Sequence, residues 1–381
     1  MSLPASVLRT THYLGFDDPS GYAVAAKRCY GALAAGGADV VWVPFTPSWD
    51  WELGYAPLVP SSVGGSPDTV VAHLPAEYYG RVRECYPEAL VVGHTVWETE
   101  RIPSPWLGLL EVPDLLVVPT AWNARTMTAA GVSTPVGVVP HATAPAAEGH
   151  SETWAAGEGA FVFYTIAPWT ARKSVWNTVR AYLEAFTPAD PVLLVVKTSP
   201  VDLTSTSPFS GSPVGPGSAA RALAHVIKDY PHPAPVHLVT RTLTDAELAA
   251  LHRRGQCFVS LSRAEGWGLG AFDAAAYGNP VVATGWGGPL EYLDADTAWL
   301  VDFDLVPAHD PAPGTLYTSD QRWAEPSIIH AARQLRRVFE HRGEAAVRAD
   351  RLRRRVHERY GPAAVAEAFV RAVASGLRRS A

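Results

Sequence analysis

The segment of residues 257–291 constrains the fold of this chain more than any other. An apolar run at 257–261 is followed by a glycine-rich loop at 265–270, a short helical stretch at 271–277 and a second apolar run at 280–283. This order predicts a strand, a loop, a helix and a strand. Small residues in such a loop let a ligand approach the backbone closely. The free N–H groups of the following helix favour an anion such as a phosphate.

Two carboxylates accompany this loop. Glu265 lies in the loop and Asp273 lies early in the predicted helix. Carboxylates repel a phosphate but accept hydrogen bonds from hydroxyl groups, so we expect one of them to face a sugar and the other a ribose. An ordinary βαβ crossover is the alternative, although a crossover by itself requires neither the carboxylates nor so many glycines.

The length of the chain favours two domains. Its 381 residues are many for a single hydrophobic core, and residues 144–159 are small, acidic and irregular, as expected of a linker. We therefore expect one domain over residues 1–150 and a second over residues 151–361. The segment 199–218 is predicted to be an irregular insertion, and the segment 302–326 a proline-rich loop.

Composition argues against several classes of protein. The net charge of −6 gives no support for nucleic-acid binding. The first eight residues lack the pattern of a signal peptide, and no apolar run approaches the roughly 18 residues of a membrane span. The three cysteines follow no metal-binding spacing and favour free thiols in a reducing compartment. We expect a cytoplasmic protein without a membrane span.

Arginines gather in residues 333–381. They open the alternative of a nucleic-acid binder or an anionic-lipid surface. No aromatic platform accompanies them, so we interpret them as a solvated helix face.

The first part of the chain has a strand, a turn, a helix and a strand in order. An apolar run at 8–15 precedes a turn with Ser20 and Gly21, and helical spacing at 22–35 precedes a strand at 40–45. Ser20 is a candidate N-cap. The arrangement predicts half of a nucleotide-binding fold.

A histidine comes directly after the strand predicted at 89–93. His94 directly follows this strand, and Trp97 and Glu98 come soon after it. Ligands of open α/β sheets bind beyond the carboxyl ends of the strands, so we expect His94 near the ligand's sugar or the reacting centre. A helix-capping or core histidine is the alternative. His141 follows a later strand and is either a phosphate or sugar neighbour or a turn residue.

Two cations precede the first helix predicted in the second half of the chain. Arg172 and Lys173 lie directly before residues 174–186, whose apolar spacing is helical. Positive charges at a helix N-terminus are unfavourable unless an anion joins them, which favours a diphosphate here. A solvated surface pair is the alternative.

The glycine-rich segment resembles the signature of glycosyltransferase family four. That signature reads Glu-Gly-Phe-Gly-Leu, a second carboxylate eight positions after the first, Gly-x-Pro-Val-Val-Ala and Gly-Gly-Pro-x-Glu. The corresponding positions in this sequence are 265–269, Asp273, 278–283 and 287–291. Trp267 stands in place of the Phe, and an aspartate stands in place of the second glutamate.

Shorter matches to the family lie elsewhere in the chain. Arg172 and Lys173 resemble the family's Arg-Lys-Gly before a helix, with Ser174 in place of the glycine. The run 98–106 resembles a subgroup with a Trp-Glu and a downstream Pro-x-x-Trp. The turn at 140–142 resembles a Pro-His-Gly turn, with alanine in place of its glycine.

The resemblance implies a GT-B architecture, in which two Rossmann-like α/β domains face a central cleft. Residues 1–150 are then the acceptor-binding domain and residues 151–361 the nucleotide-sugar-binding domain, with a terminal helix at 362–381 packed back on the first. Family members retain the anomeric configuration and need no metal, so we expect neither a metal site nor another cofactor. The Asp-x-Asp triplets at 294–296 and 302–304 come after the donor loop and are not interpreted as a metal site.

The resemblance also implies roles for single residues. The residues expected at the reacting centre are Arg172, Lys173, Glu265 and His94. The further donor-binding residues are Ser20, Gly21, Lys197, Arg241, Gly266, Trp267, Gly268, Leu269 and Asp273. The acceptor-side candidates are Trp97, Glu98 and His141. For Lys197 the alternative is a lysine at a sheet edge, and for Arg241 a residue that only fixes its loop.

The expected activity is transfer of a sugar from a nucleotide-diphosphate donor to a small-molecule or glycan acceptor, with no nucleic-acid partner. Two alternatives share the fold. A sugar-nucleotide 2-epimerase would change its donor without an acceptor, and a non-catalytic glycosyltransferase-like partner protein would turn over nothing.

Overall fold

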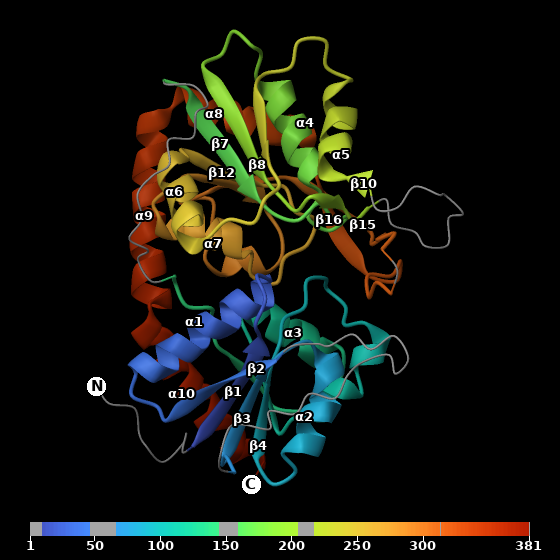
Figure 1. The fold of residues 1–381 in the computed structure, drawn as a ribbon, viewed down its shortest axis with the longest axis vertical. Coiled ribbons are helices and arrows are strands. Elements are labelled where there is room, and N and C mark those ends of the chain that lie inside the picture. Colours follow the sequence, from blue (N-terminus) through green and yellow to red (C-terminus); the bar gives the residue numbers. More distant parts are fainter. Residues whose placement is uncertain (1–9, 46–65, 145–158, 205–216, 313, 381) are drawn as a thin grey trace. The chain divides into compact units, whose positions relative to one another are not determined.

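The computed structural model describes residues 10–45, 66–144, 159–204, 217–312 and 314–380 (Figure 1). The chain separates into two compact units, called here unit 1 (Met1–Thr143 with His357–Ala381) and unit 2 (Ala144–Val356). Each unit is built around its own parallel sheet of six strands. Almost all of the predicted linker 144–159 lies outside the described residues.

The sheet of unit 1 has the strand order β2-β1-β3-β4-β5-β6, with every pair parallel. The strand bounds are Thr11–Phe16 (β1), Val40–Phe45 (β2), Thr69–His73 (β3), Leu90–His94 (β4), Leu115–Val118 (β5) and Val136–Val138 (β6). Strands β1, β3 and β5 are buried along their whole length. Such burial is expected of a parallel sheet whose two faces are both covered.

Helices pack around this sheet. They are α1 (Gly21–Ala35), α2 (Tyr79–Cys85), α3 (Ala121–Ala129) and α10 (Pro362–Ser380), with short 3₁₀ helices η1 (Ala76–Tyr78), η2 (Ser104–Trp106) and η3 (Leu109–Glu111). The Ser20 hydroxyl accepts a hydrogen bond from the Ala23 amide at 3.2 Å, which confirms the predicted N-cap of α1. Helix α10 packs beside α1 and against β5 and β6, and brings Val365, Phe369 and Val373 into the core of unit 1.

The sheet of unit 2 has the strand order β11-β8-β7-β12-β13-β14, again with every pair parallel. The strand bounds are Phe161–Ile166 (β7), Val192–Lys197 (β8), Val236–Val239 (β11), Cys257–Ser260 (β12), Val281–Thr284 (β13) and Trp299–Val301 (β14). The central strands β7 and β12 lie side by side, so the loops that leave their carboxyl ends are neighbours.

The helices of unit 2 are α4 (Val175–Ala185), α5 (Ala219–Ile227), α6 (Asp245–Arg254), α7 (Leu269–Ala276), α8 (Ile328–Glu340) and α9 (Arg342–Tyr360), with the 3₁₀ helix η4 (Gly288–Glu291). The last residues of α9 belong to unit 1. Thr244 starts α6 with a capping box, because its side chain bonds the Glu247 amide and the Glu247 side chain bonds the Thr244 amide. The core of unit 2 includes Phe163, Val259 and Leu335.

Two short antiparallel pairs stand outside this sheet. They are β9 (Val201–Asp202) with β10 (Gly217–Ser218), and β15 (Phe303–Pro307) with β16 (Arg322–Pro326). The second pair corrects the prediction of a loop over 302–326. Two of the prolines that suggested a loop, Pro307 and Pro326, lie at the ends of their strands, where proline is tolerated. Most of the predicted insertion 199–218 lies outside the described residues.

Candidate active site

Two loops meet at the carboxyl ends of the neighbouring strands β7 and β12 in unit 2. The first loop, residues 170–174, leads into α4, and the second, residues 262–268, leads into α7. The Arg263 amide donates to the Arg172 carbonyl at 2.8 Å, and the Ser174 hydroxyl donates to the Leu261 carbonyl at 2.6 Å. The two loops are therefore held together by a backbone bond and a side-chain bond before any ligand is considered.

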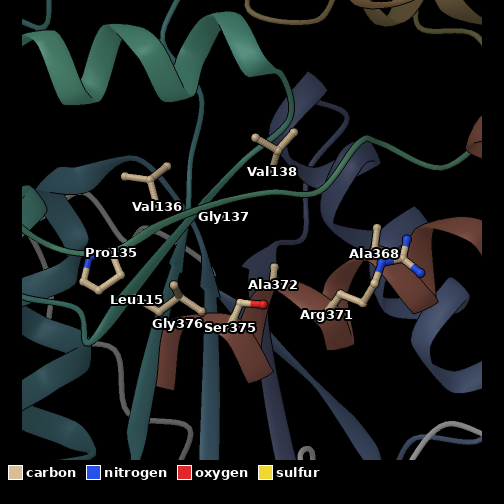
Figure 2. A pocket seen from close by; sticks show the side chains of 10 residues that line it. All are labelled: Leu115, Pro135, Val136, Gly137, Val138, Ala368, Arg371, Ala372, Ser375 and Gly376. Carbon is tan, nitrogen blue, oxygen red and sulfur yellow. The ribbon is translucent and has the colours of Figure 1, made fainter. Parts of the chain in front are cut away.

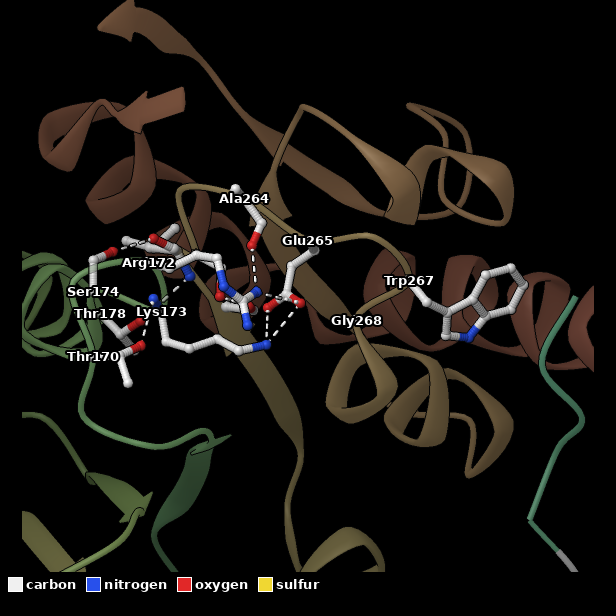
Figure 3. Close-up of polar contacts among 12 residues, drawn as sticks. Thr170, Arg172, Lys173, Ser174, Thr178, Ala264, Glu265, Trp267 and Gly268 are labelled. Carbon is white, nitrogen blue, oxygen red and sulfur yellow. Dashed lines mark hydrogen bonds and ion pairs between the residues drawn. The ribbon is translucent and has the colours of Figure 1, made fainter. Parts of the chain in front are cut away.

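Arg172, Lys173 and Glu265 form an ion cluster between these loops (Figure 3). The Lys173 ammonium donates to both carboxylate oxygens of Glu265, at 2.6 and 2.7 Å. An Arg172 guanidinium nitrogen lies 3.5 Å from the same carboxylate and donates to the Ala264 carbonyl at 2.9 Å. The side chains are mostly buried, with 18 % of Arg172, 18 % of Lys173 and 13 % of Glu265 exposed.

The carboxylate of this cluster stays ionised. Burial alone would raise the pKa of Glu265. The charges of Lys173 and Arg172, together with hydrogen bonds from Lys173 and Ser262, outweigh this effect and hold the pKa of Glu265 below its ordinary value. The sequence predicted separate tasks for the cations and for Glu265, and it did not predict that they pair. The pairing follows from the adjacency of β7 and β12, because a buried carboxylate requires a counter-charge.

Ser174 begins α4 in an unusual backbone conformation. Its φ of 38° and ψ of 48° are left-handed, and among the described residues other than glycine it is alone in having a positive φ. The family resemblance has a glycine at this position, and glycine adopts this conformation without strain. The fully buried serine instead bonds the Leu261 carbonyl through its hydroxyl, which ties the start of α4 to the end of β12.

Glycines let the second loop, residues 262–268, pack against the glycine turn at 287–288. Gly268 has a φ of +81° and directly precedes α7 at Leu269. A Cβ on Gly288 would lie 1.9 Å from the Gly266 carbonyl oxygen, and the Gly288 amide donates to the Glu265 carbonyl at 2.8 Å. This close backbone contact fixes the position from which the Glu265 side chain reaches Lys173.

Trp267 points away from the ion cluster in Figure 3. Its indole is 3 % exposed and packs against the rings of Phe272 and Tyr292. The Tyr292 hydroxyl lies 3.0 Å from the carbonyls of both Trp267 and Gly268. In this structure Trp267 stabilises the loop through these ring contacts, and its donor-binding role stays a prediction.

A second group of cations lies along the same edge of the sheet. Lys197 ends β8 and Arg241 follows β11, and these two strands are paired. Burial and the nearby charge of Arg241 lower the pKa of Lys197. Arg241 also forms an ion pair with Glu247 at 2.5 Å. Asp273, on α7, is half-buried.

The structure brings His94 and His141 together with three residues that the sequence did not single out. His73 and His94 are register partners at the ends of β3 and β4, and their rings stack with centroids 3.7 Å apart. The His141 ring lies 5.8 Å from the first and 5.9 Å from the second. The Tyr13 hydroxyl lies 2.9 Å from His73 Nδ1 and 3.4 Å from His94 Nδ1, and Cys29 Sγ lies within 4.8 Å of nitrogen atoms of both.

This histidine cluster (Tyr13, Cys29, His73, His94 and His141) is buried, with at most 4 % of any member exposed. Burial and the neighbouring rings lower the pKa of His73 and His94 well below the ordinary 6.5. Burial lowers the pKa of His141 to about 3. The rings are therefore neutral, and His94 lies inside unit 1 rather than on its surface. Its role at a donor sugar stays a prediction.

The remaining candidates of unit 1 lie near the carboxyl ends of its strands. Trp97 is 3 % exposed, and its indole nitrogen donates to the Arg101 carbonyl at 2.7 Å. Glu98 is half-buried, Ser20 caps α1 and Gly21 is exposed at the start of that helix. The structure thus gives Trp97 a supporting contact. The acceptor role of Trp97 and Glu98 and the donor-binding role of Ser20 and Gly21 stay predictions.

A cavity of about 290 Å³ lies elsewhere in unit 1, between β6 and α10 (Figure 2). Its walls include Val136, Gly137 and Ala372, and its charged side chain, Arg371, also pairs with Glu367. None of the residues that the sequence singled out lines this cavity.

Within the described part of the chain, no helix is long and apolar enough to cross a membrane.

A comparison with protein families finds a match that covers part of the chain. Residues 214–369 match the model described as "Family 4 Glycosyltransferase in conflict systems". The matched residues contain Glu265, the glycine loop and α7, whereas Arg172 and Lys173 precede them. No curated protein sequence matches the chain.

Solved structures share the fold. HepE from Anabaena, crystallised with UDP and glucose, has a TM-score of 0.66 at 15 % identity, over 96 % of this chain and 99 % of that chain. Sucrose-phosphate synthase from Thermosynechococcus elongatus has a TM-score of 0.64 at 15 % identity, over 98 % and 100 %. The pneumococcal O-GlcNAc transferase GtfA, in complex with UDP and GlcNAc, has a TM-score of 0.53 at 14 % identity, over 81 % and 57 %. These likenesses confirm the predicted GT-B fold.

Proposed function

We propose that this chain, as a family 4 glycosyltransferase, transfers a sugar from a nucleoside-diphosphate sugar to a small-molecule or glycan acceptor. The transfer retains the anomeric configuration of the sugar. In the reaction, the bond from the anomeric carbon to the diphosphate oxygen breaks, and a bond to the acceptor nucleophile forms on the same face. The acceptor proton passes to the departing phosphate oxygen, and the nucleoside diphosphate leaves.

The observation that carries this proposal is the ion cluster of Arg172, Lys173 and Glu265. Its two cations and one carboxylate sum to a charge of +1 in a mostly buried place. Helix α4 begins directly after the cations, and α7 begins after the loop that holds Glu265. Cations together with free helix N–H groups favour an anion, which supports a diphosphate at this place.

The cluster divides the donor between its members. Arg172 and Lys173 stabilise the negative charge that grows on the diphosphate as its bond to the sugar breaks. They supply from the protein the positive charge that a metal ion supplies in other transferases. Glu265 cannot hold a phosphate, and it accepts hydrogen bonds from sugar hydroxyls once the cations turn toward the diphosphate. Cleavage that runs ahead of attack gives an oxocarbenium-like state, which is compatible with attack on the same face.

The other candidates have supporting parts in the proposal. Asp273 binds the ribose hydroxyls, and the neighbouring cations Lys197 and Arg241 add positive potential at the same edge of the sheet. His94 reaches a sugar only if its ring leaves the buried histidine cluster, and we assign it no step.

A thermal-shift titration with UDP, GDP, ADP and dTDP in the presence of EDTA tests the donor site. UDP is the first choice because the HepE and GtfA structures contain it. We expect one nucleoside diphosphate to raise Tm. At a hundredfold excess over Kd, binding stabilises the folded protein by about 2.7 kcal/mol. If none of the four raises Tm, the proposal is wrong and the non-catalytic alternative gains support.

Incubation of the donor alone separates the transferase from the 2-epimerase. An epimerase releases a changed sugar nucleotide without an acceptor. The transferase leaves the donor intact apart from slow hydrolysis until an acceptor is added. NMR of the anomeric proton of the product then tests retention.

A further inference from the structure

The hairpin of β15 and β16 packs on the candidate active site. Its strands pair antiparallel from Phe303–Pro326 to Pro307–Arg322, outside the six-stranded sheet. Trp323 of β16 is 2 % exposed and shares a hydrophobic cluster with Ala171, Ala264 and Ala308. Ala171 directly precedes Arg172, and Ala264 directly precedes Glu265. The hairpin therefore contacts both loops next to their charged residues.

Arg263 joins the hairpin to the two loops. Its guanidinium carbon lies 5.2 Å from the ring centroid of Trp176 on α4 and 5.2 Å from that of Trp323 on β16. Its Nε lies 2.6 Å from a carboxylate oxygen of Glu325, and its Nη1 donates to the Ala171 carbonyl at 3.2 Å. A guanidinium between two aromatic faces is held in its plane as well as in its place.

The backbone of Arg263 repeats these connections. Its amide donates to the Arg172 carbonyl at 2.8 Å, and its carbonyl accepts from the Ala324 amide at 2.9 Å. The partner of its side chain, Glu325, also accepts from Asn177 of α4 at 2.8 Å. Arg263 and its carboxylate partner Glu325 thus connect the first loop, the second loop, α4 and the hairpin.

The connection between the two strands also reaches the ion cluster. The Arg172 guanidinium lies over the ring of Tyr317, 5.7 Å from its centroid. Arg172 therefore contacts the hairpin segment on one side and the Ala264 carbonyl and Glu265 on the other. The hairpin segment therefore contacts both the first loop, at Ala171, and the guanidinium of Arg172.

Arg263 itself is not placed to bind a diphosphate. It is 17 % exposed at the side chain, and Glu325 neutralises its charge. Arg263 donates to the carbonyls of Ala171 and Arg172, and Ala264 connects it to Glu265 along the chain. Its effect on an anion must pass through these residues.

We propose that Arg263, with Glu325 and Trp323 of the hairpin, is a positioning residue that sets the distance between the Arg172–Lys173 cations and Glu265 and so the grip on the donor's diphosphate. This inference rests on the proposed function. It assigns the segment 302–326 a task that the sequence did not reveal.

The test measures the affinity of UDP and of UMP by calorimetry for the full chain and for Arg263→Lys. Lysine keeps the charge but loses the planar stack and the fixed bond to the Ala171 carbonyl. UDP and UMP share their base, their ribose and one phosphate, so the ratio of their affinities isolates the grip on the second phosphate. We expect the preference for UDP over UMP to fall by about tenfold or more, as when groups that orient binding residues are removed. UMP affinity should stay within about twofold.

Two further variants complete the test. Glu325→Gln keeps a hydrogen-bond acceptor for Asn177 but loses the charge that holds Arg263, so it should reduce the same ratio without truncating the core, and it decides the matter if Arg263→Lys does not fold. Arg322→Lys, on the exposed side of β16, is the matched control and should leave the ratio unchanged.

The two possible failures are distinguishable. If the unaltered protein binds no nucleoside diphosphate, the proposed function is wrong and the inference goes with it. If the protein binds UDP and both variants keep its preference over UMP, or lose UDP and UMP alike, the proposed function stands and the positioning role is wrong.

Discussion

The Lys173 ammonium bonds both carboxylate oxygens of Glu265, at 2.6 and 2.7 Å, across 92 positions of the sequence. In the proposed function, this pair holds the Lys173 cation at the diphosphate site before a ligand arrives. A diphosphate that enters must compete with the carboxylate for Lys173, and a sugar that enters must compete with Lys173 for the carboxylate. A donor that carries both groups satisfies both partners at once.

Glu265→Gln tests this competition. The change leaves two buried cations with one counter-charge fewer, so we expect the ligand-free protein to lose about 3 kcal/mol of stability. UDP, which has no sugar, should then bind as tightly as before or more tightly and raise Tm by more than in the unaltered protein, while sugar transfer is lost. Glu367→Gln, at an exposed helix pair, is the control and should change none of these. Weaker UDP binding in Glu265→Gln would contradict the competition.

Arg172→Ala tests the stabilisation of the leaving group. The guanidinium acts on charge that develops in the transition state, so kcat at saturating donor should fall by about 10²-fold or more. Arg180→Ala, an exposed position on α4, is the matched control and should keep full turnover. Near-normal kcat in Arg172→Ala would remove this residue from the mechanism.

The histidine cluster predicts a loss of stability in mild acid. In the folded chain His73, His94 and His141 stay neutral, because burial lowers each pKa below the ordinary 6.5. The unfolded chain takes up protons as pH falls through about 6.5, so stability is full above that pH and is lost below it, over a window that extends to about 3 for His141. Each histidine contributes at most about 1.4 kcal/mol per pH unit.

Chemical unfolding at pH 7.5, 6 and 5 measures this effect. Above pH 5 the carboxylates contribute little, since the pKa of Glu265 lies below its ordinary 4.5. His141→Asn should make the pH dependence shallower, whereas His232→Gln, at an exposed position, should leave it unchanged. A stability that is flat between pH 7.5 and 5 would show that the rings can be protonated in place.

The backbone of Ser174 predicts different losses of stability for two small substitutions. Alanine keeps the strained left-handed backbone and loses the hydroxyl bond to Leu261, so Ser174→Ala should destabilise by about 1 kcal/mol. Glycine loses the same bond but relieves a strain of about 1 kcal/mol, so Ser174→Gly should be close to neutral. Urea unfolding of both variants gives the difference directly. Equal losses would mean that the backbone of Ser174 is not strained.

The sequence predicted the parts of the site that depend on neighbours along the chain. The glycines at 266 and 268, the carboxylates at 265 and 273 and the cations before α4 each follow from local spacing, and the strand–loop–helix pattern put them at the carboxyl edges of sheets. The confirmed N-cap at Ser20 is of the same local kind.

The relations that the sequence did not reveal all depend on register between distant segments. Glu265 meets Lys173 because β12 pairs with β7, and His73 meets His94 because β3 pairs with β4 in register. The β15–β16 hairpin was predicted to be a loop because of its prolines, although Pro307 and Pro326 lie only at the ends of its strands. No local pattern contains the partners of Arg263, since Trp176 lies far before the glycine loop in the sequence and Trp323 far after it.

The order in which the chain is made leaves unit 1 incomplete until the residues of α10 have been added. Val365, Phe369 and Val373 complete its core, yet the ribosome adds them after every residue of unit 2. The nascent first sheet must therefore wait, with an apolar face open, while the second unit can fold as soon as its own residues emerge. The half that is synthesised first is the half that matures last, and a chaperone that shields that open face during elongation would be most needed there.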